Sequence, residues 1–175
     1  MLSIYRPQPT ARAAAHLSWG VAVPHVLVEY SANLQTQVDF PGFLTALRDA
    51  ALATGIFPLG GIRLRAYQAD HYLIADGDVD NAFVAITLRI GHGRDFETRK
   101  RASDAIFATA CETLETLYQR IPLGISLEMQ EIAPTLTYKK NNLHEYVKKR
   151  AAAGAKTAHA EPVARADREG RGSRR

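Results

Sequence analysis

Residues 23–30 read Val-Pro-His-Val-Leu-Val-Glu-Tyr, a short stretch that opens on an apolar residue and a proline. Val26, Val28 and Tyr30 occupy every second position, and β-branched and aromatic residues favour strands. Proline has no N–H to donate to a neighbouring strand, so the first position of a strand is one of the few that it tolerates. The stretch therefore predicts a β-strand that starts at Pro24.

The chemistry of Pro24 depends on whether another residue precedes it. Inside a chain its nitrogen belongs to an amide, which is not basic. At the start of a chain the same nitrogen is a secondary amine, and α-amino groups have reference pKa values of roughly 7.7–8.0. A chain that begins at Pro24 therefore carries a general base on its first strand. The pattern alone indicates only a strand-opening proline without chemistry.

The composition is that of one globular domain with tails. The chain has 175 residues, of which 46% are hydrophobic, and this suffices for one core. No apolar run approaches the roughly 18–20 residues that a membrane span needs, so a soluble protein without a membrane partner is expected. The single cysteine excludes an intramolecular disulfide.

The positive charge lies in the tails. Of the formal net charge of +4, residues 1–23 contribute +2 and residues 151–175 contribute +3, so residues 24–150 carry −1. A slightly acidic domain does not match a phosphate backbone, and binding of nucleic acid by the domain is not expected. A nucleic-acid-associated role through the basic tail remains as one alternative. It predicts binding that is lost at high salt and on truncation after Lys149.

Strand and helix patterns alternate along the domain. Four segments have apolar residues at every second position, and two segments between them have apolar residues at helical spacing. The strands are expected at residues 24–30, 62–67, 82–90 and 123–129, and the helices at about 43–54 and 96–120. Two strand–helix–strand units in succession predict a duplicated β-α-β fold.

The long crossovers imply that the two strands of each unit are parallel. We expect an α+β fold, a four-stranded sheet with two helices on one face, and association of subunits to cover the other face. Residues 132–150 are expected to form an arm or edge strand with a short helix. Residues 151–175 show no periodicity and are expected to be a disordered basic tail.

Five stretches, in the same order along the chain, resemble the 5-carboxymethyl-2-hydroxymuconate Δ-isomerase family of the tautomerase superfamily. The stretches are PHVLVEYS at 24–31, ATGIFPLGGIR at 53–63, ADG at 75–77, LRIGHGR at 88–94 and PTLTYKKNN at 134–142. The similarity runs from Pro24 to about Lys149, and several motifs in order are more specific than any one of them.

The resemblance implies a tautomerase-like homotrimer in the cytoplasm that isomerises an unsaturated polycarboxylate in homoprotocatechuate degradation, without a cofactor. The starting proline of the family, which carries the proton, aligns with Pro24. Its two substrate-facing arginines align with Arg63 and Arg94. His25 either contacts the substrate or has only a structural role at the edge of a strand. No metal is expected, because the other histidines lack partners at metal-ligand spacing.

These residue types suit the implied chemistry. Planar guanidinium groups bind carboxylates through paired hydrogen bonds, as Arg63 and Arg94 would bind the substrate. A free Pro24 amine beside two cations in a partly apolar pocket has a lowered pKa, because desolvation and like charge both disfavour its protonated form. Neutral, proton-accepting proline would then dominate.

The residues before Pro24 decide between an enzyme and a binding protein. Valine codons serve as bacterial starts that are read as methionine, so Val23 is one expected true start, and removal of that methionine exposes Pro24. Residues 1–23 also weakly resemble an organelle transit peptide. If they are retained, the expected protein is a catalytically silent tautomerase-fold trimer, because Pro24 is blocked.

Overall fold

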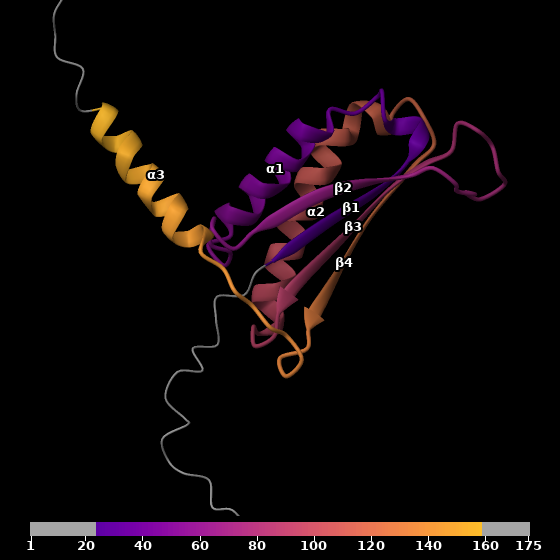
Figure 1. The fold of residues 1–175 in the computed structure, drawn as a ribbon. Helices are drawn as coiled ribbons and strands as arrows, with labels where there is room; N and C mark the ends of the chain where they lie inside the picture. The colour runs from indigo at the N-terminus through magenta and orange to yellow at the C-terminus, as the bar shows by residue number, and fades with distance from the viewer. Residues whose placement is uncertain (1–23, 159–175) are drawn as a thin grey trace, which may run out of the picture. The chain divides into compact units, whose positions relative to one another are not determined.

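The computed structural model describes residues 24–158, which fall into two units divided after Lys140. The first unit holds the sheet, its two helices and one short 3-10 turn, and the second unit holds one helix (Figure 1). The elements are β1 (His25–Ser31), η1 (Ala32–Leu34), α1 (Phe40–Ala53), β2 (Arg63–Ala69), β3 (Ala82–Gly91), α2 (Phe96–Tyr118), β4 (Leu123–Ile132) and α3 (Leu143–Ala158).

The sheet has four strands in the order β2-β1-β3-β4. β1 pairs with β2 in parallel, β3 pairs with β4 in parallel, and the central pair of β1 and β3 is antiparallel. Each parallel pair is joined through a helix, as a crossover connection requires. The predicted duplication and the predicted parallel pairing within each unit are confirmed.

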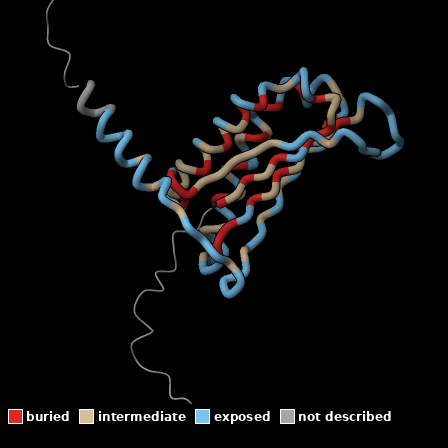
Figure 2. Tube along the Cα trace, in the orientation of Figure 1, coloured by how far each residue is buried: buried red, intermediate tan, exposed pale blue. Residues whose placement is uncertain are grey.

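Both helices of the first unit lie on the same face of the sheet (Figure 1). The buried positions alternate along β1 and β3, as Figure 2 shows, and Val28 and Ile86 are at most 2% exposed. Leu47 of α1 and Ile106 of α2 are fully buried in the same core. This packing confirms the predicted α+β class, with two helices on one face of a four-stranded sheet. No helix of the described first unit covers the other face.

Helix α1 begins at Phe40, three residues before the predicted start. The side chain of Asp39 accepts a hydrogen bond from the Gly42 N–H and caps the helix. Pro41 lies in the first turn, where a helix does not need the N–H that proline lacks. Pro41-Gly42 is therefore the first turn of the helix and not a break before it.

Helix α3 corrects the prediction for the C-terminal region. It extends to Ala158, whereas disorder was expected from residue 151. Alanine has the highest intrinsic helix propensity, so the run at 151–153 continues the helix without any apolar period. The predicted extension 1–23 and the tail at 159–175 lie outside the described residues. Within residues 24–158, no helix is long and apolar enough to cross a membrane.

Ser31 generates a prediction about stability. Its fully buried hydroxyl donates to Asn33 Oδ1 at 2.7 Å and accepts from the Phe83 N–H at 3.1 Å. In Ser31→Ala the Phe83 N–H loses this acceptor, so the free energy of unfolding falls by about 1–3 kcal/mol. Urea denaturation at fixed protein concentration measures the change. The exposed Thr36→Ala is the control, and an equal loss in both variants would contradict the role of the hydroxyl.

Candidate active site

Pro24 and Arg63 meet at one end of the sheet. The side chain of Pro24 is fully buried, and its carbonyl oxygen accepts a hydrogen bond from the Arg63 N–H at 3.0 Å. This bond extends the parallel ladder in which His25 is the partner of Arg63. Because parallel strands begin at the same edge of a sheet, two residues far apart in the sequence become neighbours.

Arg94 lies in the loop that follows β3, at the same end of the sheet. His25 pairs with Arg89 in the antiparallel ladder, so the end of β3 lies beside the start of β1. The guanidinium of Arg94 donates to the carbonyls of Gly91 at 3.2 Å and Ile56 at 3.1 Å. Arg94 therefore links the end of β3 to the loop between α1 and β2.

The two arginines are held by backbone carbonyls and an aromatic ring. Arg63 donates from Nη1 to the Gly61 carbonyl at 2.6 Å, and the Arg94 guanidinium lies 5.6 Å from the centre of the Phe57 ring. Phe57 is only 4% exposed, so this contact is shielded on the ring side. A cation over an aromatic face is attracted to it without being neutralised. Both side chains remain cationic and partly accessible.

His25 lies among positive charges. It alternates with buried Val26, so its side chain is on the sheet face that no helix of the unit covers, and its Nδ1 is 3.1 Å from Nη1 of Arg65. Burial lowers the pKa of His25, and the positive charges of Arg65, Arg63, Arg89 and Lys139 lower it further, in that order. The neutral ring can accept a hydrogen bond from Arg65.

Three of the cationic side chains around His25 were not among the site residues expected from the sequence. Arg65 shares a strand face with Arg63, and this was visible in the alternating pattern of residues 62–67. Arg89 faces His25 only through the antiparallel register, and Lys139 reaches it from the segment after β4. The one available signal for Lys139 was its place in the PTLTYKKNN stretch.

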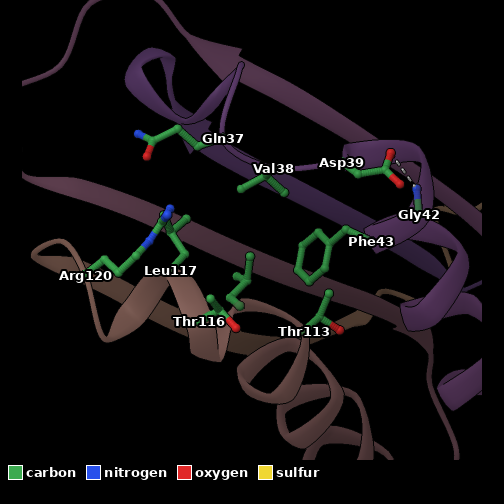
Figure 3. Close-up of a pocket in the computed structure, with 10 residues that line it drawn as sticks. Gln37, Val38, Asp39, Gly42, Phe43, Thr113, Thr116, Leu117 and Arg120 are labelled. Atoms are coloured by element: carbon green, nitrogen blue, oxygen red, sulfur yellow. Dashed lines mark hydrogen bonds between the residues drawn. The ribbon is translucent and has the colours of Figure 1, made fainter.

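A cavity of about 430 Å³ lies elsewhere, between the start of α1 and the end of α2 (Figure 3). Asp39 and Phe43 line one side of it, and Thr113 and Arg120 line the other. The carboxylate of Asp39 is already used to cap α1. This cavity follows the far end of β1, so it is not part of the site around Pro24.

The arrangement at the start of β1 suits acid–base chemistry on an anion. Cationic side chains gather at the end of the sheet where Pro24 is buried, and a guanidinium can bind a carboxylate through two parallel hydrogen bonds. Within residues 24–158, no group of three His, Cys, Asp or Glu side chains is arranged to hold a metal ion. Candidate proton carriers at this place are the ring of His25 and, in a chain that begins at Pro24, the Pro24 nitrogen.

Two comparisons with known proteins indicate the same family. The sequence model of the 5-carboxymethyl-2-hydroxymuconate isomerase family matches residues 24–147. A curated 5-carboxymethyl-2-hydroxymuconate Delta-isomerase of Escherichia coli is 40% identical over 126 residues, which cover 72% of this chain and 100% of the relative. The match therefore spans the whole relative and leaves the terminal segments of this chain outside it.

Solved structures share the fold. A 5-carboxymethyl-2-hydroxymuconate isomerase from Deinococcus radiodurans R1 is 37% identical, with a TM-score of 0.69, over 74% of this chain and 97% of that one. A fused 4-OT wild-type symmetric trimer is 18% identical, with a TM-score of 0.50, over 70% of this chain and 98% of that one. At this lower identity the likeness concerns the fold alone.

The charges around His25 generate a prediction. Replacing Arg65 by glutamine removes the largest electrostatic cause of the low His25 pKa, so Arg65→Gln raises that pKa towards its ordinary value of 6.5. Titration of the His25 ring protons by NMR measures the shift. Arg48→Gln on α1, where the side chain pairs with Asp49, is the control. An unchanged His25 pKa in Arg65→Gln would show that Arg65 does not act on the ring.

Proposed function

The chain belongs to the 5-carboxymethyl-2-hydroxymuconate isomerase family and is an isomerase of the tautomerase type, and on this premise we propose how it works. It shifts a double bond in an unsaturated polycarboxylate of the kind for which its relatives are named. The Pro24 nitrogen carries the proton, Arg63 and Arg94 bind the substrate, and His25 lies at the edge of the binding site. No cofactor takes part.

The observation that carries the proposal is the hydrogen bond between the Pro24 carbonyl and the Arg63 N–H. It fixes the start of β1 against the start of β2, beside the end of β3 from which Arg94 extends. A guanidinium has five N–H donors. The carbonyl contacts described above use one donor of Arg63 and two of Arg94. The remaining donors suit the carboxylates of a substrate.

The proposed reaction moves one proton between two atoms of the substrate. A dienol becomes a conjugated ketone when its O–H proton is removed and a proton is delivered to carbon. One carrier with a pKa close to ambient pH serves both steps. Burial and the nearby guanidinium groups favour the neutral form of a free Pro24 amine, which is the form that accepts the proton. The same guanidinium groups stabilise negative charge that develops on the dienolate oxygen.

This mechanism requires that the working chain begin at Pro24. The family match, which starts at residue 24, supports such a start, and initiation at Val23 followed by loss of the initiator methionine would produce it. In the full sequence the Pro24 nitrogen is an amide. For that form the second candidate function is a tautomerase-fold protein that binds polycarboxylates without turnover.

We propose that the protein is a homotrimer in the cytoplasm, in homoprotocatechuate degradation. The sheet face without helices supports association, because Leu27 and Ala85 on it are only partly covered within one chain. A symmetric trimer is named among proteins that share the fold. Packing of these faces around a threefold axis would cover the apolar positions.

The start of the chain gives the first test of the mechanism. A protein that begins at Pro24 is active, and the same protein with Val23 left in place loses about 10²–10⁴-fold in kcat, because its Pro24 nitrogen is an amide. Pro24→Ala also loses most activity while the fold is kept. Intact mass establishes each N-terminus, and circular dichroism checks the fold. Full activity in protein that retains residues 1–23 would contradict the proline mechanism.

The arginines give the second test. Charged hydrogen bonds contribute about 1.5–3 kcal/mol each, so Arg63→Ala or Arg94→Ala lowers kcat/KM by about 10- to 100-fold on a polycarboxylate. Arg48→Ala, on the outer side of α1, leaves kcat/KM unchanged. Steady-state kinetics on protein that begins at Pro24 measures all three. Normal kcat/KM in both site variants would show that neither arginine binds the substrate.

A further inference from the structure

We propose that Glu131 of β4 is a positioning residue for substrate binding, because it holds the loop that carries Arg94. The inference rests on the proposed function of Arg94. The loop comprises residues 92–95, between the end of β3 and the start of α2. We call it the Arg94 loop.

One carboxylate contacts the chain on both sides of Arg94. Glu131 Oε1 lies 3.5 Å from Nδ1 of His92, and Oε2 lies 2.9 Å from Nη1 of Arg99. His92 is the first residue of the Arg94 loop, and Arg99 lies in the first turns of α2. Glu131 is 29% exposed and Arg99 is 32% exposed, so solvent screens their ion pair only in part. The Glu131 side chain therefore connects both ends of residues 92–99 to β4.

Glu131 itself is fixed by the sheet. It pairs with Ile90 in the parallel ladder between β3 and β4, one position before the last pair, Gly91 with Ile132. Its side chain is on the same face of β4 as that of Met129, two positions earlier, which packs against the core, and it contacts Arg99 of α2. Strands hold side chains more rigidly than loops do. The carboxylate is therefore a fixed point from which the loop can be held.

The Arg94 loop needs a contact with a fixed side chain because the glycine in the loop allows its backbone several conformations. Gly93 has a φ of +106°, a region that glycine enters readily and other residues rarely do. The contacts of Arg94 itself run to the Gly91 and Ile56 carbonyls and to the ring of Phe57. These partners carry no charge, and the Gly91 carbonyl directly precedes the loop, so the position of the guanidinium depends on the position of the loop.

The charge of Glu131 matters, and not only its size. His92 is 61% exposed and Arg99 has a buried Nε without a hydrogen-bond partner among the described residues. The Glu131 carboxylate is thus the acceptor that holds the guanidinium of Arg99. An amide at residue 131 keeps the volume but loses the ion pair and replaces one acceptor oxygen by a donor. The loop would then be released from β4 without a cavity being formed.

Kinetics of Glu131→Gln, in protein that begins at Pro24, tests the proposal. Glu131→Gln displaces Arg94 and leaves the proton carrier on β1 untouched, so KM rises about three- to tenfold, and kcat falls only by the part of the dienolate stabilisation that Arg94 supplies. In an Arg94→Ala background the same substitution produces no further rise in KM, because the loop then holds no binding group. Glu131→Asp restores part of the lost affinity. A purely structural role would not give this dependence on Arg94.

A second measurement does not depend on turnover. Hydrogen exchange of the amides at residues 92–95 becomes faster in Glu131→Gln, and exchange within β1 stays as in the parent protein. The matched control is Asp104→Asn, which breaks the exposed ion pair between Lys100 and Asp104 on α2. This control leaves both KM and exchange in the Arg94 loop unchanged.

Three outcomes overturn the proposal. If Arg94→Ala raises KM and Glu131→Gln does not, Glu131 has no positioning role and the proposed function stands. If Glu131→Gln raises KM equally with and without Arg94, Glu131 acts elsewhere. If Arg94→Ala leaves KM unchanged, the substrate site assigned under the proposed function is wrong, and the reason to hold the loop disappears with it.

Discussion

The central place of β1 in the sheet is the constraint on which the candidate site depends. β1 is paired on both sides, in parallel with β2 and antiparallel with β3. The start of β1 therefore meets the start of one neighbour and the end of the other. Pro24, Arg63 and the start of the Arg94 loop are brought together by hydrogen bonds of the backbone. Side-chain contacts then refine residue positions that the pairing of the strands has already fixed.

The site is built from like charges that are not neutralised within it. Arg63 and Arg94 donate to carbonyls, and Arg65 contacts a histidine whose pKa is lowered. Carbonyl oxygens orient a guanidinium without removing its charge, so the cations stay available to an anion. Glu131, the nearby carboxylate, pairs with His92 at the start of the loop and with Arg99 of α2. The acid that contacts the loop is thus separate from the cations of the candidate site.

The two faces of the sheet have different tasks. On one face, alternating residues of all four strands pack under α1 and α2 and form the core. On the other face lie His25, Arg65 and Arg89, together with partly covered apolar residues. Because successive side chains of a strand point to opposite faces, the same short strand supplies both the core and the site. The buried Val26 and Val28 hold β1 in the register that places Pro24.

The sequence by itself determined the strands, the helices and their duplication, because alternating and helical apolar spacings are local properties of the chain. It also pointed to Pro24, Arg63 and Arg94, through motifs whose order resembles one family. Only the tertiary structure decided that Arg65 contacts His25, that Lys139 lies near the same ring, and that Glu131 ties the loop of Arg94 to β4. The physical reason is that strand register and the chain segments between strands set these contacts. No spacing within a single segment records which residues of distant segments will meet.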